Sequence, residues 1–208
     1  MLKLTTPWRL RKLGIMGMNA RNHAFIQHFN ERRHFPGVDD KLMTRKLTSR
    51  ASIRGPKLLG VVRFQHEVKH LREQVAEHDS FVIKPSKGSG GKGILVIKER
   101  CDEAFVKSSG KRIKFAAIQR HVTNILSGLY SLGGQADVAV IEECIQFSDA
   151  FADYSYQGVP DLRVIVFLGY PVMAMMRLST KASDGKANLH QGAIGVGINL
   201  ASGKASSA

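Results

Sequence analysis

Three glycines and two lysines lie in one short segment, residues 86–92, between two runs of β-branched residues. These runs, residues 81–85 and 93–97, predict the strands of a hairpin, with Lys84 on the strand that enters the loop. Glycine leaves backbone amides unhindered and lysine attracts anions, so a loop of this composition fits nucleotide phosphates. The candidate phosphate ligands are Lys84, Lys87, Gly88, Ser89, Gly90, Gly91, Lys92 and Gly93.

The glycine spacing in residues 88–93 matches the pattern G-x-G-x-x-G, which occurs in several kinds of nucleotide site. A dinucleotide-binding fingerprint and a P-loop both lead into a helix, whereas this loop leads into a predicted strand. The chain also lacks the His-Arg-Asp and Asp-Phe-Gly motifs of protein kinases. The pattern favours a flap over nucleotide phosphates, and a mobile hairpin without a ligand is the alternative.

The H-E-x-x-H pattern of His66, Glu67 and His70 is a second candidate site. On an α-helix the two imidazoles would lie one turn apart and could bind zinc, while the glutamate activates water. However, a helix over residues 67–77 would turn the histidines toward its polar side and bring Lys69 beside the metal. We therefore expect a solvated helix, and a zinc hydrolase is the alternative.

Acidic residues follow a predicted buried strand, residues 138–141. Carboxylates at a strand end can accept hydrogen bonds from an adenine amino group or from ribose hydroxyls, while the adjacent backbone binds the ring edge. An ordinary strand that leaves the core is the alternative. The residues concerned are Glu142, Glu143, Cys144, Ile145 and Asp149.

Two arginines form a third candidate set on a second predicted hairpin, residues 161–178. Strand alternation puts Asp161 and Arg163 on one face, with Arg177 roughly opposite across the turn. Paired guanidinium groups can hold a carboxylate or a phosphate through parallel hydrogen bonds, and Asn188 adds an amide on the following loop. Ordinary surface ion pairing is the alternative.

Length and charge limit the class of protein. The chain has 208 residues, 43% of them hydrophobic, and a net charge of +14, which fits one or two folded domains. Residues 1–100 carry 21 basic and 8 acidic side chains, whereas residues 101–208 carry 10 and 9. A basic front half suits nucleic acid, an anionic membrane surface or nucleotide phosphates, so a basic nucleic-acid-binding module stays an alternative function. Two cysteines and no long apolar run argue against disulfide-rich and membrane-spanning proteins and favour the cytoplasm.

Three segments are expected along the chain. Residues 1–37 form a basic N-terminal segment, residues 38–200 a domain that contains the glycine-rich lid hairpin 81–97, and residues 201–208 a flexible tail of small polar residues. A helix begins near Asp40, and a longer one is predicted from about Ile113 to Leu132.

In this order the motifs resemble the ATP-grasp superfamily, and within it the α-L-glutamate ligase-like proteins related to ribosomal-protein glutamate ligase. The matching pieces lie in residues 38–195 and are Val38-Asp-Asp-Lys41, Phe81-Val-Ile-Lys84-Pro, Lys87-Gly-Ser-Gly-Gly-Lys-Gly93, Ile141-Glu-Glu-Cys-Ile145, Asp161-Leu-Arg163-Val and Asn188-Leu-His-Gln-Gly192.

The resemblance implies an α+β fold in which two α+β lobes clasp ATP. It also implies a carboxylate–amine ligase, in which a carboxylate attacks the γ-phosphate of ATP and an amine captures the acyl phosphate, releasing ADP and phosphate. The expected substrates are an amino acid such as glutamate and a peptide or protein acceptor. The implied contacts are Lys41 and Lys84 to phosphates, Glu142 and the Cys144-Ile145 backbone to adenine, Asp149 to ribose, and Arg163, Arg177 and Asn188 to the substrate carboxylate and its acyl phosphate.

The resemblance is incomplete near both ends of the chain. Members of the superfamily carry a late Glu-x-Asn motif that binds Mg²⁺, and nothing after Gly192 matches it. The ribosomal-protein enzymes carry a separate leading domain, and in its place this sequence has only about forty residues before Asp40. We therefore expect a C-terminally truncated domain, with Mg²⁺ ligands beyond Ala208, that holds adenine weakly and does not complete catalysis by itself.

Overall fold

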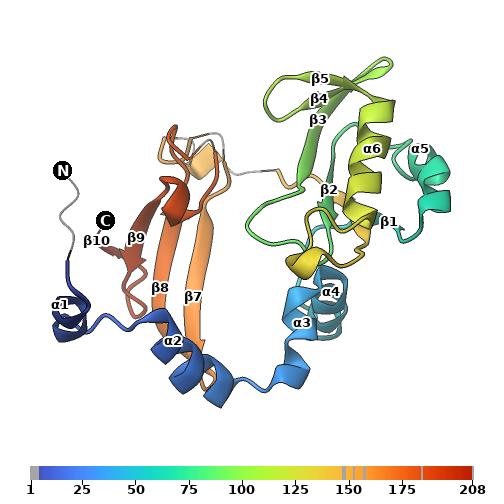
Figure 1. The fold of residues 1–208 in the computed structure, drawn as a ribbon. Helices are drawn as coiled ribbons and strands as arrows, with labels where there is room; N and C mark the ends of the chain where they lie inside the picture. The colour runs from blue at the N-terminus through green and yellow to red at the C-terminus, as the bar shows by residue number, and fades with distance from the viewer. Residues whose placement is uncertain (1–4, 147–148, 152, 157, 184, 208) are drawn as a thin grey trace. The chain divides into compact units, whose positions relative to one another are not determined.

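The computed structural model describes residues 5–146, 149–151, 153–156, 158–183 and 185–207. It divides into a first unit, residues 1–144, and a second unit, residues 145–208. Helices and two antiparallel sheets make up these units, so the α+β class predicted from the sequence is confirmed (Figure 1).

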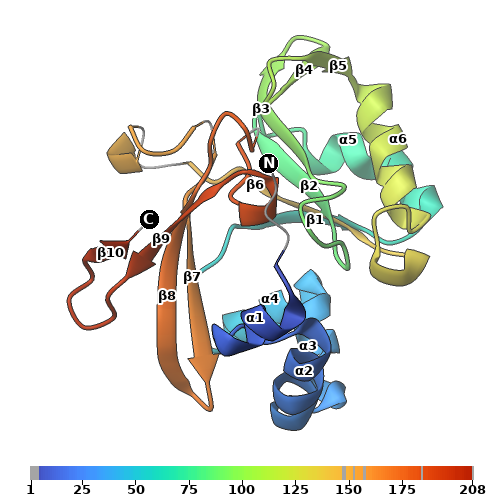
Figure 2. The same cartoon turned by 60° about the vertical axis from the view of Figure 1, so that its left-hand side comes forward.

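The first unit is built on a six-stranded antiparallel sheet in the order β1-β6-β2-β3-β4-β5 (Figure 2). The predicted hairpin around the glycine loop is confirmed, because β2 pairs with β3 through Phe81–Ile97, Val82–Val96 and Ile83–Leu95. Strand β6 lies between β2 and the edge strand β1. The strands are β1 (Leu58–Val62), β2 (Phe81–Pro85), β3 (Leu95–Cys101), β4 (Ala104–Lys107), β5 (Arg112–Lys114) and β6 (Ala139–Glu143).

Helix α6 (Phe115–Leu126) packs against one face of this sheet (Figure 1). It buries apolar side chains spaced three and four residues apart, as an amphipathic helix does. The helix is shorter than predicted at both ends. Strand β5 occupies Arg112–Lys114, and Gly128 ends the helical segment with φ +83°, a conformation that favours glycine. The buried helix residues are Phe115, Ile118, Val122 and Ile125.

Helix α4 (Lys41–Arg50) begins where the sequence predicted it. Asp40 is its N-cap, because Oδ1 of Asp40 accepts the backbone N–H groups of Leu42 and Met43 at 2.9 and 3.3 Å. Helices that the sequence did not predict precede it. They are α1 (Pro7–Lys12), α2 (Met18–Arg21), a π-helix (Asn22–Gln27), a 3₁₀-helix (Arg32–His34) and α3 (Pro36–Asp39).

The second unit is a four-stranded antiparallel sheet in the order β10-β9-β8-β7. The predicted hairpin is confirmed, with a two-residue turn at Leu168 and Gly169, which both have positive φ as a type I′ turn requires. The end of the chain differs from the expected tail, since residues 205–207 pair with β9 after a turn closed by Asn199. The strands are β7 (Asp161–Phe167), β8 (Tyr170–Leu178), β9 (Ile194–Ile198) and β10 (Ala205–Ser207).

Within the described part of the chain, no helix combines the length and the apolar content that crossing a bilayer requires.

Candidate functional site

The glycine loop between β2 and β3 is fixed at the end where it leaves β2. The backbone N–H of Lys87 donates to both carboxylate oxygens of Asp137, each at 3.0 Å. Asp137 is buried and also accepts from the Ser131 hydroxyl at 2.5 Å and the Val138 amide at 2.7 Å. Asp137 was not predicted from the sequence, where the available signal was an aspartate directly before a predicted buried strand.

The other end of the loop is held by two aromatic side chains. Nε2 of His121, on α6, donates to the carbonyl oxygen of Gly93 at 2.9 Å. Burial lowers the pKa of His121, which favours the neutral ring. Gly93 has φ +74° and passes so close to the Tyr130 ring that a Cβ there would lie 2.5 Å from it. Glycine is thus required at this position by both conformation and space.

The tip of the loop is open. Gly90 and Gly91 both have positive φ, and a Cβ on either would meet no atom within 4 Å. Lys92 is exposed, and its backbone N–H donates to the carbonyl of Ser89 at 3.2 Å. A loop with two fixed ends and an unobstructed cationic tip can close on an anion without disturbing the sheet.

Lys41 joins the start of α4 to the beginning of the loop. Its Nζ donates to the carbonyl oxygens of Ser86 and Gly88 at 3.2 and 2.5 Å. Burial, and then the nearby charge of Lys84, lower the pKa of Lys41. The expected phosphate ligand therefore lies at the loop, although in this structure its ammonium group is bonded to loop carbonyls.

Asp40 makes a second connection at this point, accepting from the Ser86 hydroxyl at 2.6 Å. Burial alone would raise the pKa of Asp40, but the hydrogen bonds from Ser86 and from the first turn of α4 outweigh it and lower that pKa. The carboxylate is thereby held in its charged form beside the loop lysines.

Lys84 and Glu142 lie together on one face of the sheet. Val140 is the direct cross-strand partner of Lys84, and Glu142 is the diagonal one, with Nζ of Lys84 2.5 Å from Oε2 of Glu142. Arg45, from α4, reaches the other oxygen of Glu142 at 3.3 Å. Arg45 was not predicted from the sequence. The available signal was its position four residues after Lys41, which puts both side chains on one face of the predicted helix. One buried carboxylate thus holds two cations beside the glycine loop.

The other residues expected to hold adenine and ribose are Glu143, Cys144, Ile145 and Asp149. Oε1 of Glu143 accepts the backbone N–H of Lys57 at 2.7 Å, which ties β6 to the chain before β1. Cys144 is the last residue of the first unit, and burial raises the pKa of its thiol. Ile145 begins the second unit. The side chain of Asp149 lies outside the described residues.

The two candidate arginines of the second unit differ, because Arg177 forms an ion pair with Asp161 and Arg163 does not. Asp161 and Arg177 are direct cross-strand partners, and Nε and Nη2 of Arg177 donate to the two oxygens of Asp161. This pairing raises the pKa of Arg177. Arg163, two residues along β7, makes no ion pair within the described part of the chain. Nδ2 of Asn188 lies 3.4 Å from the side-chain oxygen of Gln191.

The H-E-x-x-H residues lie on a 3₁₀-helix, Gln65–His70, rather than on an α-helix. With about three residues per turn, residues four apart do not share a face. Oε2 of Glu67 accepts the backbone N–H groups of Arg63 and Phe64 at 2.6 and 3.1 Å, which lowers the pKa of Glu67. Glu67 therefore caps the helix, and the helix does not place the two histidines one above the other.

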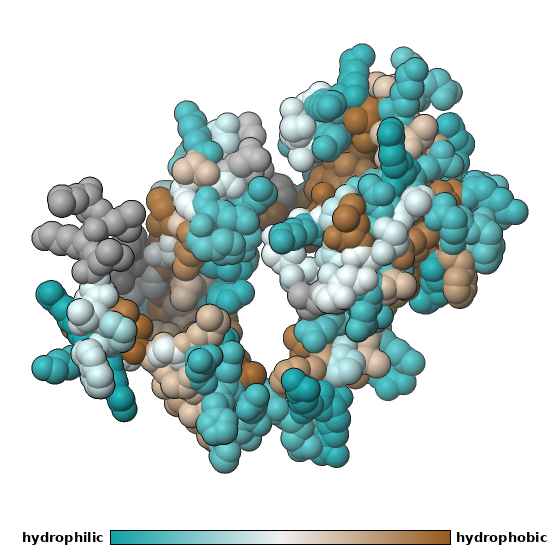
Figure 3. Space-filling view, in the orientation of Figure 1, coloured by the Kyte–Doolittle hydropathy of each residue, from teal (hydrophilic) through white to brown (hydrophobic). Residues whose placement is uncertain are grey.

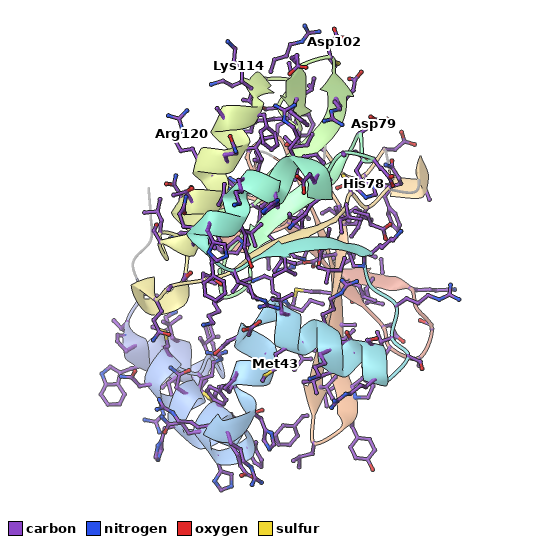
Figure 4. The ribbon with its side chains drawn as sticks, turned by 90° about the vertical axis from the view of Figure 1, so that its right-hand side faces the viewer. Met43, His78, Asp79, Asp102, Lys114 and Arg120 are labelled. Carbon is purple, nitrogen blue, oxygen red and sulfur yellow. The ribbon has the colours of Figure 1, made fainter. Side chains whose placement is uncertain are left out.

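A cleft of about 610 Å³ opens in the first unit beside Lys87. Met43, labelled in Figure 4, lines it from α4, and Phe35 adds a second apolar wall. Arg32 and Asp39 bring opposite charges to the same cleft, and neither side chain makes a hydrogen bond or ion pair to the residues that the structure describes. The cleft can therefore accept a small ligand that carries both charges.

Comparisons with known proteins identify the family of the chain. No curated protein matches the chain. Residues 20–208 match the family described as sugar-transfer associated ATP-grasp, which confirms the ATP-grasp part of the resemblance. Because the matched region covers nearly the whole sequence, this chain belongs to the sugar-transfer-associated ATP-grasp family.

Proposed function

We propose that this chain binds ATP under its glycine loop and uses it to join a carboxylate to an amine. The observation that carries the proposal is the arrangement of cations around that loop. Lys41 bonds its carbonyls, and Lys84 and Arg45 share one buried carboxylate beside it. The membership of the family supports an ATP-dependent, ligase-type enzyme.

Phosphate binding would fall to the loop itself. The amides of residues 88–93 and the ammonium groups of Lys87 and Lys92 would contact phosphate oxygens once the tip closes. A bound triphosphate would also draw Lys41 away from its present partners, because phosphate oxygens carry more negative charge than backbone carbonyls. Lys84 would share its ammonium group between a phosphate oxygen and Glu142, its present partner. Glu142 would keep Arg45 as its partner during this exchange.

The adenine and ribose contacts are the expected ones. Glu142, at the end of β6, would accept from the adenine amino group, since a carboxylate can accept about four hydrogen bonds and two of those on Glu142 are accounted for here. Glu143 and the backbone of Cys144 and Ile145 would line the ring, and Asp149 would bind the ribose.

The chemical step needs positioning and charge neutralisation. A substrate carboxylate oxygen attacks the γ-phosphorus as its bond to the bridging oxygen breaks, so ADP leaves and an acyl phosphate forms. An amine then attacks the acyl carbon, loses a proton and expels phosphate. We propose that Arg163, Arg177 and Asn188 orient the carboxylate and the acyl phosphate, with Arg177 held in position by Asp161.

Mg²⁺ is the metal that the superfamily implies. The described carboxylates nearest the loop are already engaged: Asp137 by two backbone amides and a hydroxyl, Glu142 by two cations, and Asp40 by the first turn of α4. Among the residues that the structure describes, no group of three acidic, histidine or cysteine side chains could hold a metal ion. These residues do not fit Mg²⁺, and we assign no step to it.

Glutamate is the amino acid that we propose as substrate. An amino acid carries an ammonium and a carboxylate group on one carbon, which matches Asp39 and Arg32 in the cleft beside Lys87. A peptide or protein would supply the other reacting group. We place the reaction in the cytoplasm, where Cys101 and Cys144, both free thiols, would stay reduced.

ATP binding tests the proposal most directly. Lys92→Met should weaken ATP affinity about tenfold in isothermal titration calorimetry, the effect of losing one charge-assisted contact. Lys111→Met, an exposed lysine in the turn before β5, is the matched control and should bind ATP normally. Equal affinities for the two variants, or no ATP binding by the unaltered chain, would overturn the proposal.

Substrate identity needs a separate assay. This chain alone is expected to release little phosphate, because its domain is expected to be incomplete. Any release from ATP should depend on glutamate and on a peptide acceptor, with a product heavier by one glutamyl residue in mass spectrometry. Uronic acids and amino sugars make a useful second set of substrates, because the family is described as sugar-transfer associated. Phosphate release with those compounds and not with glutamate would reject the amino-acid part of the proposal and leave the ATP part standing.

A further inference from the structure

The segment before α3 exposes large apolar side chains that no core uses. Trp8 is 75% exposed, Leu13 68% and Met18 72%. Ile15 and Met16, between α1 and α2, are also exposed. Leaving this much apolar surface in water is unfavourable by about 25 cal/mol per Å², so contiguous exposure of this kind marks an interaction surface.

Basic side chains are interleaved with these apolar ones. Arg9, Arg11 and Lys12 lie on α1, and Arg21 ends α2. Residues 1–30 contain no aspartate or glutamate. None of the three cations on α1 forms an ion pair with the described residues. Their charge is therefore available to an outside partner.

A groove of about 560 Å³ runs along the same segment, lined mostly by apolar residues and by one cation. Hydrophilic and hydrophobic surfaces adjoin over α1 and α2 (Figure 3). Residues 7–18, which carry most of this surface, precede the region that matches the family. The main lining residues are Pro7, Leu10, Arg11, Ile15 and Met16.

We propose that residues 7–21, which we call the basic arm, dock on the surface of an anionic phospholipid bilayer. Tryptophan, leucine and methionine side chains enter the boundary between headgroups and acyl chains, while arginine and lysine contact lipid phosphates. Nucleic acid would bind the basic side chains, but it offers no apolar environment in which leucine, isoleucine and methionine side chains would be buried. The apolar residues therefore favour the bilayer. This inference does not depend on the proposed ligase activity.

Trp8 allows a direct test, because it is the only tryptophan in the chain. Its emission should be that of a water-exposed indole in buffer and should shift to shorter wavelength when vesicles containing 30% phosphatidylglycerol are added. Vesicles of pure phosphatidylcholine should cause little shift, and added salt should weaken binding. Emission that is already blue-shifted in buffer would show that Trp8 is covered by protein and would overturn the proposal.

Charge variants locate the surface. Replacing Arg9, Arg11 and Lys12 by serine should lower partitioning to the anionic vesicles about a hundredfold in sedimentation assays, at about 1 kcal/mol for each basic side chain near the membrane. The matched control replaces Lys111, Arg112 and Lys114 by serine, which removes the same charge from exposed positions around β5 (Figure 4 labels Lys114). Equal losses in the two triple variants would reject the basic arm as the site.

An apolar variant separates bilayer from nucleic acid. Leu13→Ser should reduce vesicle binding about tenfold, whereas Leu129→Ser, 65% exposed after α6, should not. Circular dichroism would check that both variants are folded. If the chain binds a single-stranded oligonucleotide but not anionic vesicles, and Leu13→Ser binds the oligonucleotide as well as the parent does, the arm is a nucleic-acid site and the proposal fails.

Discussion

Each of the two sheets carries a cation and a carboxylate on neighbouring antiparallel strands, but the two pairs differ in burial and in the number of partners. In the first unit Lys84 pairs with Glu142, whose side chain is 8% exposed and is shared with Arg45. In the second unit Arg177 pairs with Asp161, whose side chain is 41% exposed and pairs with no other cation in the described part of the chain. The carboxylate is thus buried and shared in the first sheet, whereas in the second sheet it is partly exposed beside an arginine that is itself 14% exposed.

Burial decides what each pair contributes to stability. Removing one member of a buried ion pair leaves charge without compensation and costs several kcal/mol, whereas an exposed pair contributes about 0–1 kcal/mol. Among the residues that the structure describes, the members of the buried hydrophobic cluster all lie between Val62 and Ile141, in the first unit. The first unit is therefore where single substitutions should unfold the chain.

The largest effect is expected for Glu142→Gln. Lys84 and Arg45 would face each other without a counter-charge, and the free energy of unfolding should fall by about 3 kcal/mol in urea denaturation. Asp161→Asn is the matched control and should cost less than about 1 kcal/mol. Similar losses for the two variants would mean that burial does not distinguish the pairs.

The turns of the two hairpins allow a sharper comparison. Gly93 and Gly169 both have positive φ, but only Gly93 has a ring against it, with nothing within 4 Å of a Cβ at Gly169. Gly169→Ala should cost about 1 kcal/mol from conformation alone, and Gly93→Ala about 1–2 kcal/mol more, because Tyr130 must move. Thermal unfolding measures both.

Tyr130→Ala supplies the control for that comparison. When Gly93→Ala is made in the Tyr130→Ala variant, the free energy of unfolding should fall only by the amount due to the positive φ, because the ring that a Cβ would meet is gone. If the cost persists, the position depends on its positive φ and not on the close approach of Tyr130.

Local patterns predicted the elements that local physics determines. The glycine hairpin, the helix that begins near Asp40 and the second hairpin each follow from turn chemistry, strand alternation or capping within a few residues, and each is confirmed. The predicted end of α6, at about Leu132, was wrong because Gly128 stops the helix before the Gly133-Gly134 pair. Strands β9 and β10 were missed because glycine and small polar residues hide the period-two pattern.

The candidate site was less predictable than the fold, because its contacts join distant segments. Lys84 and Glu142 were both predicted as site residues. Their bond to each other was not predicted, because it depends on the register of β2 against β6. Asp137 and Arg45 were missed for the same reason. Arg177 was expected to hold a substrate carboxylate together with Arg163, with surface ion pairing as the alternative, and the register places it directly opposite Asp161, with which it pairs.

Acid titration gives a smaller effect at the junction of α4 and the loop. The pKa of Asp40 is lowered in the folded state from the ordinary value of 3.8, so its charged form stabilises the fold above that pH and the contribution is lost as pH falls through the folded-state pKa. Asp40→Asn keeps a capping oxygen and should cost about 0.5–1 kcal/mol at pH 7.

The difference between parent and Asp40→Asn should shrink as pH falls below about 3.8, since protonated aspartate and asparagine are then alike in charge. Asp39→Asn is the matched control, because its carboxylate makes no hydrogen bond to a described residue. Guanidinium denaturation at several pH values measures the trend. A constant difference across that range would show that Asp40 does not act through its charge.

The smallest effects are expected from the two arginines of the second unit. Arg163→Ala should change the free energy of unfolding by less than about 0.5 kcal/mol, because the side chain has no ion-pair partner among the described residues. Arg177→Ala should cost up to about 1 kcal/mol, the contribution of its pair with Asp161. If Arg163→Ala lowers ATP-dependent phosphate release while stability stays constant, the loss must come from substrate contacts, whereas equal loss of stability and release would point to a purely structural role.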